Sequence, residues 1–278
     1  MRIDKVNQKI FIRQSWLGDM TICPERARLG QIRPEFRTGS DATIIGTSLH
    51  AGIESVLDGR SSDIAGMVEV VNNEYATLEQ TNYKKTNIDP DKIPSYLESM
   101  SLAFYDGILP HVEQGGKVEH KFSSSLGFTI NGYAVYVEGT MDYVTPSGVI
   151  WDWKTASRQY NIKEKQKSNI QASVYADACV SLGLAPEYPV DFRFGVMVRQ
   201  EKPKSQIVSI VRTEAHGQWL RQYIRGAVNT AMNNGYENNW IMNDSSALCS
   251  ESWCSYWSIC KGAFVRAGDD AFPEQLDV

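Results

Sequence analysis

The chain has 278 residues, of which 42% are hydrophobic and 22% are charged, and its formal net charge is -5 at pH 7. A chain of this length and composition can bury a large core, which excludes a low-complexity or unfolded polypeptide. The negative net charge argues against indiscriminate binding of polyanions, because phosphate neutralisation scales with local Lys and Arg.

The first motif in chain order lies in a segment of helical spacing over residues 46–54, which contains His50 and Glu54 one turn apart. A single histidine on a helix is usually a packed or surface residue, so His50 becomes a candidate ligand only together with the other motifs of the chain. Two amphipathic helices follow, over residues 62–81 and 93–112. We interpret residues 58–115, which include both, as a helical insertion.

A β-hairpin is predicted next. Residues 133–144 are rich in β-branched and aromatic types, residues 145–148 supply the turn chemistry of Pro and Gly, and a second strand follows over 149–155. If the loop has five residues, Asp142 falls opposite Asp152 and both carboxylates meet on one face, whereas a four-residue loop separates them. We predict the odd-numbered loop or a compensating bulge.

Alternate residues of a strand share a face, so Asp152 and Lys154 project together while Trp151 and Trp153 project to the other side. Two close carboxylates repel each other unless a cation bridges them, and oxygen ligands favour Mg²⁺ or Mn²⁺. The alternative interpretation is a pair of solvated acids with Lys154 as an ion-pair partner. Glu119, on a strand predicted from the alternation of residues 118–122, is a secondary candidate for the same site.

Helical spacing returns around Gln171 and Tyr175. Two more strands are predicted over residues 190–198 and 206–212, and a helix over 214–234. The hairpin, these strands and the strand at 118–122 form the expected sheet core, residues 116–213.

The cysteines are unevenly placed: Cys23 lies near the start, Cys249, Cys254 and Cys260 lie close together near the end, and Cys179 lies in a predicted helix. We find no signal peptide and no apolar run that could span a membrane, and we therefore expect a cytoplasmic protein. In that compartment disulfides are uncommon and cysteine clusters usually bind metal. Cys179 is expected to pack in the core.

The order of these motifs resembles the RecB-type branch of the PD-(D/E)XK nuclease superfamily, over roughly residues 20–262. The resemblance implies roles for seven residues. His50, Asp142, Asp152 and the carbonyl of Trp153 would hold Mg²⁺ or Mn²⁺, Lys154 would orient or deprotonate the attacking water, and Gln171 and Tyr175 would line the DNA path.

The cysteine arrangement resembles the iron-sulfur nucleases, which include the CRISPR-adaptation exonucleases and the AddB subunit. This resemblance implies a cluster of the 4Fe-4S type held by Cys23, Cys249, Cys254 and Cys260, which would clasp the two chain ends together. The spacing departs from the family's late triplet, since four residues separate Cys249 from Cys254 and five separate Cys254 from Cys260. A structural Zn²⁺ on the same thiolates and unligated thiols in a helical cap both stay open.

We therefore expect one nuclease domain over residues 1–278, with a mixed α/β sheet flanked by helices and a cysteine cap over 245–262 joined to Cys23. The expected function is a metal-dependent DNA exonuclease, acting on single-stranded or frayed ends in DNA repair, recombination or phage DNA processing. Its setting would be a bacterial or phage-infected cell, with a recombination or helicase protein as a partner. The alternatives are an idle DNA-binding or assembly subunit of the same fold, a structure-specific endonuclease, and a cluster-bearing redox or sensing protein.

Overall fold

The computed structural model describes residues 1–37, 39–81, 83, 85–86, 88–167, 169–243, 245 and 247–260. The chain divides into two compact units. The sheet unit comprises Arg2–Gln14 and Gly39–Tyr223, and the terminal unit comprises Met1, Ser15–Thr38 and the chain from Ile224 onward. In the part of the chain that is described, no helix has both the length and the hydropathy of a membrane span.

A mixed sheet of seven strands, counted over the described residues, forms the centre of the sheet unit. The strands are β1 (Arg2–Asp4), β2 (Lys9–Arg13), β3 (Lys117–Ile130), β4 (Tyr133–Val144), β5 (Ile150–Ala156), β6 (Val190–Val198) and β7 (Ser205–Arg212). Their order is β1-β2-β4-β5-β6-β7, and β3 pairs with β4. The pairs β2–β4 and β5–β6 are parallel and the others are antiparallel. The predicted fold class, a mixed sheet flanked by helices, is confirmed.

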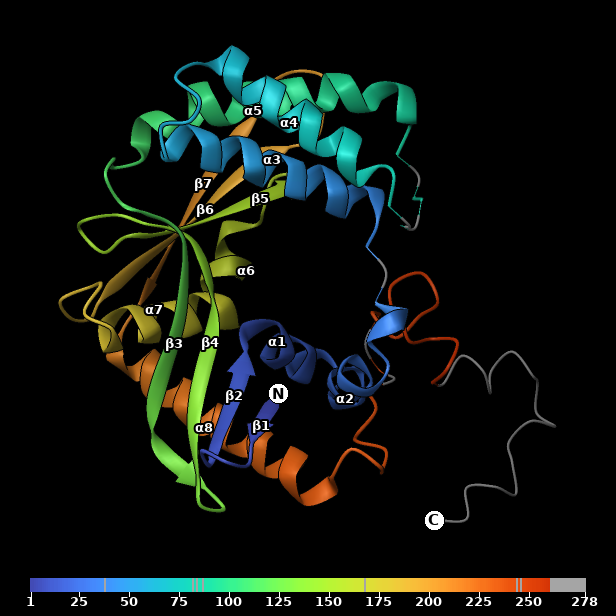
Figure 1. Cartoon of the computed structure of the whole chain (residues 1–278), viewed down its shortest axis with the longest axis vertical. Helices are drawn as coiled ribbons and strands as arrows, with labels where there is room; N and C mark the ends of the chain where they lie inside the picture. The colour runs from blue at the N-terminus through green and yellow to red at the C-terminus, as the bar shows by residue number, and fades with distance from the viewer. Residues whose placement is uncertain are drawn as a thin grey trace. The chain divides into compact units, whose positions relative to one another are not determined.

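Three helices of the sheet unit pack together next to β5, β6 and β7 (Figure 1). They are α3 (Asp41–Leu57), α4 (Ile64–Leu78) and α5 (Ile93–Gly107). The core between these helices and the sheet contains Trp151 and Trp153 of β5, whose rings stack 5.5 Å apart, and Phe104 of α5, which meets Trp153 edge to face at 5.3 Å. The two tryptophans therefore take the apolar face of β5 and leave its other face to Asp152 and Lys154.

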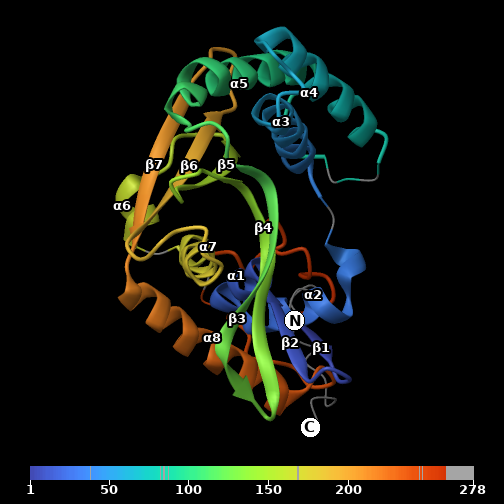
Figure 2. The ribbon, with the colours of Figure 1, turned by 60° about the vertical axis from the view of Figure 1, so that its left-hand side comes forward.

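The remaining helices of the sheet unit are α6 (Ile162–Lys167) and α7 (Ile170–Ser181), with short 3-10 turns at Pro90–Lys92 and Leu109–His111. Asn169 caps α7, because its side chain accepts a hydrogen bond from the main-chain N–H of Ala172. α7 packs beside the long β3–β4 pair in both views (Figure 2). The first turn of α7 thus lies where it can present Gln171 to the sheet.

The hairpin between β4 and β5 has the odd-numbered loop that we predicted. β4 ends at Val144 and β5 begins at Ile150, and the pairs Tyr143↔Trp151 and Val144↔Ile150 set the register. Continuing this register places Asp142 opposite Asp152. Gly148, at φ +87°, allows the loop to close, since this left-handed conformation favours glycine.

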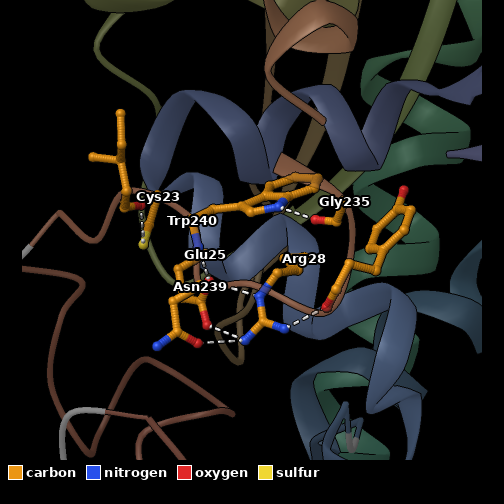
Figure 3. A network of polar contacts seen from close by, with 8 residues as sticks. Cys23, Glu25, Arg28, Gly235, Asn239 and Trp240 are labelled. Atoms are coloured by element: carbon orange, nitrogen blue, oxygen red, sulfur yellow. Dashed lines mark hydrogen bonds and ion pairs between the residues drawn. The ribbon is translucent and has the colours of Figure 1, made fainter. Parts of the chain in front are cut away.

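The terminal unit brings together segments from both ends of the chain, including α2 (Pro24–Ile32) and the part of α8 (Glu214–Asn234) that follows Tyr223. α1 (Gln14–Ile22) belongs to it from Ser15 onward, as does a 3-10 turn at Pro34–Phe36. A buried polar network joins the two segments (Figure 3). Arg28 donates to both oxygens of Glu25 at 2.6 and 2.8 Å and to the carbonyl of Tyr236 at 2.8 Å, and the main-chain N–H of Trp240 donates to Glu25 at 2.7 Å. The predicted cap over 245–262 extends two residues beyond the described part.

Candidate active site

The acidic residues of the site lie where the β4–β5 ladder ends. Beyond the last paired residues, the main-chain N–H of Trp153 donates to Asp142 Oδ2 at 2.8 Å. The carboxylate of Asp142 therefore takes the place of a main-chain acceptor and is fixed against β5.

His50 reaches this point from α3. Its Nε2 lies 2.8 Å from the carbonyl oxygen of Trp153, and its Nδ1 lies 3.7 Å from Asp142 Oδ2. Burial, together with the positive charge of Lys154, lowers the pKa of His50, so the imidazole is neutral near pH 7. A neutral imidazole is the form that binds a metal ion.

Asp152 is almost fully buried, at 1% exposure, and is held by two neighbours. Gln171 Nε2 donates to Asp152 Oδ1 at 2.5 Å, and Lys154 forms an ion pair with Oδ2. Tyr175, one turn after Gln171 on α7, is buried with its ring packed against other aromatic rings, and its hydroxyl interacts with Gln171. Tyr175 is thus buried in this structure and does not present its ring to the surface.

Glu119, a secondary candidate from the sequence, joins the site. One carboxylate oxygen each from Glu119 and Asp142 and one ring nitrogen of His50 lie within 4.8 Å of one another. Glu119 has φ +46°, a conformation that is uncommon for any residue except glycine. The sequence gives no sign of this backbone conformation at a glutamate. The one sequence signal for Glu119 as a site residue is its position in a strand that pairs with β4.

The carboxylates of the site repel one another, and this repulsion shifts their pKa values. Burial and the neighbouring charge of Asp152 raise the pKa of Asp142 well above its usual range. Burial, Glu54 and Asp152 likewise raise the pKa of Glu119. Burial is the largest single effect on Lys154 and disfavours its charge, but the attraction of Asp152 and Asp142 and the hydrogen bond to Asp152 together outweigh it, so the pKa of Lys154 is raised. One ammonium does not balance three or four acids, and the site therefore favours an additional cation.

The donor set fits a hard divalent metal ion. Carboxylate oxygens, a carbonyl and an imidazole suit Mg²⁺ or Mn²⁺. Two ligands about 2.1 Å from an ion and at right angles are about 3 Å apart, close to the 2.8 Å between His50 Nε2 and Trp153 O. The structure brings together His50, Asp142, Glu119 and the Trp153 carbonyl, whereas the oxygens of Asp152 face Lys154 and Gln171.

A cleft of about 520 Å³ opens onto these groups, within the size range of ligand sites. His50, Glu119 and Lys154 line it together with small residues of α3 such as Thr43 and Gly46. A Cβ at position 46 would lie 3.2 Å from Thr155 Oγ1, so this glycine keeps α3 and β5 close. The cleft gives a substrate access to His50, Glu119 and Lys154.

The profile of the PD-(D/E)XK nuclease superfamily matches residues 14–261. The chain belongs to the PD-(D/E)XK nuclease superfamily. It is therefore a metal-dependent nuclease by family, and nucleic acid is its class of ligand. The His50, Glu119 and Asp142 group could bind the divalent metal that such nucleases use.

Solved structures align with this PD-(D/E)XK chain over most of its length. A protein of Eubacterium rectale named "Putative exonuclease" aligns over 90% of this chain and 92% of its own, with a TM-score of 0.54 and 13% identity. The protein named SSO0001 aligns over 93% of this chain and 88% of its own, with a TM-score of 0.40 and 12% identity. No curated protein sequence matches the chain.

The terminal unit contains the four cysteines for which we predicted a shared role. Cys23, Cys249, Cys254 and Cys260 are all half-buried and line one cavity of about 30 Å³. Cys179 is buried in the sheet unit, where its Sγ lies 3.7 Å from Met141 Sδ, and burial raises its pKa to about 12. The two kinds of cysteine are thus separated, and Cys179 packs in the core as expected.

Proposed function

We propose that this nuclease is a metal-dependent DNA exonuclease that hydrolyses phosphodiesters at single-stranded or frayed ends. The carrying observation is that Asp142, Asp152 and Lys154 converge at the end of the β4–β5 ladder with His50 beside them. His50, Asp142, Glu119 and the Trp153 carbonyl would hold Mg²⁺ or Mn²⁺, whereas Asp152, which the motif resemblance also implies as a ligand, pairs with Lys154 and Gln171. Such an ion lowers the pKa of a bound water and neutralises charge on the phosphate.

The side chains of the site have separate tasks in this reaction. Lys154 has a raised pKa and stays protonated, so it acts as a positive charge that orients the water and the phosphate oxygens. Gln171 holds Asp152 in place through its amide. His50 stays neutral, which keeps its lone pair available.

Exonuclease action is supported by the name of the Eubacterium rectale structure and by the motif resemblance. The biological setting that we propose is DNA repair, recombination or phage DNA processing in the cytoplasm of a bacterial or phage-infected cell. A recombination or helicase protein would deliver the frayed end.

The test is digestion of end-labelled single- and double-stranded DNA with Mg²⁺ or Mn²⁺. We expect Asp152→Ala to lower the rate by at least about 100-fold, as is typical when a group that stabilises the transition state is lost. The control Asp91→Ala, an exposed acid, should leave the rate unchanged. Cleavage of covalently closed circles would identify an endonuclease, and absence of cleavage with intact DNA binding would identify an idle subunit.

We further propose that Cys23, Cys249, Cys254 and Cys260 hold a 4Fe-4S cluster in the terminal unit. The four side chains line one cavity of the terminal unit, which supports a shared ligand set, and a structural Zn²⁺ on the same thiolates is the alternative. Iron and sulfide content and visible absorbance should fall with Cys254→Ser and persist with Cys179→Ser, while stoichiometric zinc in colourless protein would contradict the cluster.

A further inference from the structure

A second cavity lies directly beyond the C-terminal end of β5. It has a volume of about 700 Å³ and is lined by residues 156–161 together with Glu164 and Lys165 of α6. The first cleft ends at Lys154 and Thr155, and this cavity begins at Ala156, so the two share the end of the same strand. The two linings therefore follow one another along β5 and the segment after it.

The wall of this second cavity is fixed by the neighbouring strands. Gln206 of β7 makes two hydrogen bonds to the main chain of Tyr160, accepting from its N–H at 2.8 Å and donating to its carbonyl at 3.1 Å. The ring of Tyr160 meets Phe194 of β6 edge to face at 5.8 Å. α6 packs against β7 beside this wall (Figure 2). The segment around Tyr160 is therefore held in place before any ligand binds.

Two cationic side chains in the lining indicate what kind of ligand this cavity binds. Lys165 Nζ lies 4.4 Å from the centre of the Tyr160 ring, which holds the ammonium by a cation–π interaction. Arg158 is exposed, and within the described part of the chain its guanidinium has no hydrogen bond or ion pair. Glu164 offsets part of this charge, so the wall suits a singly charged phosphodiester better than a multiply charged free anion.

We propose that this cavity binds the nucleic-acid backbone phosphate that adjoins the one undergoing hydrolysis. Arg158 and Lys165 contact that phosphate, and Tyr160 is a positioning residue that presents Lys165. This assignment rests on the proposed nuclease function. The assignment accounts for the different charges of the two cavities. The cleft beside His50 has more acids than cations, which suits a metal ion, whereas the cavity beside Tyr160 has the cations that a phosphate needs when no metal is bound there.

The test is the salt dependence of binding of a short labelled single-stranded DNA, measured by fluorescence anisotropy without divalent metal. Each lost phosphate contact lowers the slope of log K against log salt by about 0.7 for a single strand. Because both side chains contact one phosphate, we expect Arg158→Ala with Lys165→Ala to reduce the magnitude of this slope by about 0.7. The matched double variant Lys163→Ala with Lys167→Ala removes the same charge from α6 outside the cavity lining, and it should keep the wild-type slope.

The outcomes separate this inference from the proposed function. If the wild-type chain cleaves and binds DNA while both double variants share its slope, the cavity assignment is wrong and the nuclease stands. If the wild-type chain neither binds nor cleaves any nucleic acid, the proposed function fails with it. Displacement of the DNA by inorganic phosphate at constant ionic strength would overturn the assignment in favour of a free-anion site. Unchanged melting temperatures show that the variants are folded.

Discussion

Asp142 couples the protonation of the site to metal binding. Because burial and Asp152 raise its pKa, the metal-free carboxyl holds a proton at pH values where an exposed aspartate is ionised. A metal ion must displace that proton. We expect the affinity for Mn²⁺ to rise with pH by up to tenfold per unit, until the pH exceeds the folded-state pKa of Asp142. Calorimetry in buffers of different ionisation enthalpy measures the released proton, and an affinity that is independent of pH would refute the coupling.

The same shift fixes the sign of a stability change in the metal-free protein. A carboxyl whose pKa is raised by folding binds a proton more tightly in the folded state, so stability falls as pH rises from the unfolded-state pKa to the folded-state pKa. In Asp142→Asn this part of the pH dependence should be absent. Denaturant midpoints measured across that pH interval, without metal, compare the two proteins.

Glu119 is predicted to contribute directly to metal affinity. Glu119→Gln removes the charge but keeps the side-chain size and the left-handed backbone, so we expect Mn²⁺ binding to weaken about 10- to 100-fold, the range seen for groups that support a metal site, with little change in melting temperature. Glu138→Gln on β4 is the control, since Glu138 pairs with Arg2 and Arg13 instead. Equal calorimetric affinities for both variants would remove Glu119 from the site.

Among residues, the sequence predicted those whose position follows from strand periodicity. Asp152 and Lys154 share a face because they are two positions apart, and one loop length then decided where Asp142 lies. Glu119 could not be assigned in this way, because its place near His50 involves a positive φ and the position of a helix distant in sequence.

At the scale of elements, prediction succeeded where local periodicity was strong. The predicted strand 190–198 and helix 214–234 coincide with β6 and α8, and the strand predicted over 206–212 differs from β7 by one residue. The helix predicted over 93–112 ends at Gly107 instead, since a proline at position 110 disfavours helical conformation just before it. β1 and β2 were not predicted, because both are short. β2 gains its place from pairing with β4 across more than a hundred residues, and β1 pairs with β2.

Close packing of α3 against α4 gives a prediction at this scale. A Cβ at Gly52 would overlap Val71 and lie 3.2 Å from the Met67 carbonyl. Overpacking costs about 1–3 kcal/mol, and the higher helix propensity of alanine returns about 1 kcal/mol, so Gly52→Ala should be net destabilising. Gly66→Ala, whose new Cβ would meet its nearest atoms at 3.5 Å, is the control. Urea denaturation decides, and equal stability of the two variants would show that the helices are not in close contact.

At the scale of the whole molecule, segments from the two ends of the chain pack together in the terminal unit. The resemblance of the cysteine arrangement to the iron-sulfur nucleases implies this meeting of the chain ends, because a shared ligand set would bring Cys23 to residues more than two hundred positions away. The buried pair of Glu25 and Arg28 was not predicted, since an Arg three residues after a Glu is usually a solvated helix pair. Its burial depends on the segment around Tyr236 and Trp240, which covers it.

Loss of the Glu25 charge should loosen this joint between the chain ends. Glu25→Gln leaves a buried guanidinium without its counter-charge, and breaking a buried pair in this way costs about 3–5 kcal/mol. Glu35→Gln is the matched control, because the Arg33–Glu35 pair is exposed on both sides, and we expect no measurable change. Hydrogen exchange followed by peptide mass spectrometry should show faster exchange in residues 24–32 and 235–243 of Glu25→Gln, with residues 133–156 protected as in the wild type. Uniformly faster exchange over both regions would mean that the two units unfold together, and unchanged exchange in both would mean that the pair does not hold the ends.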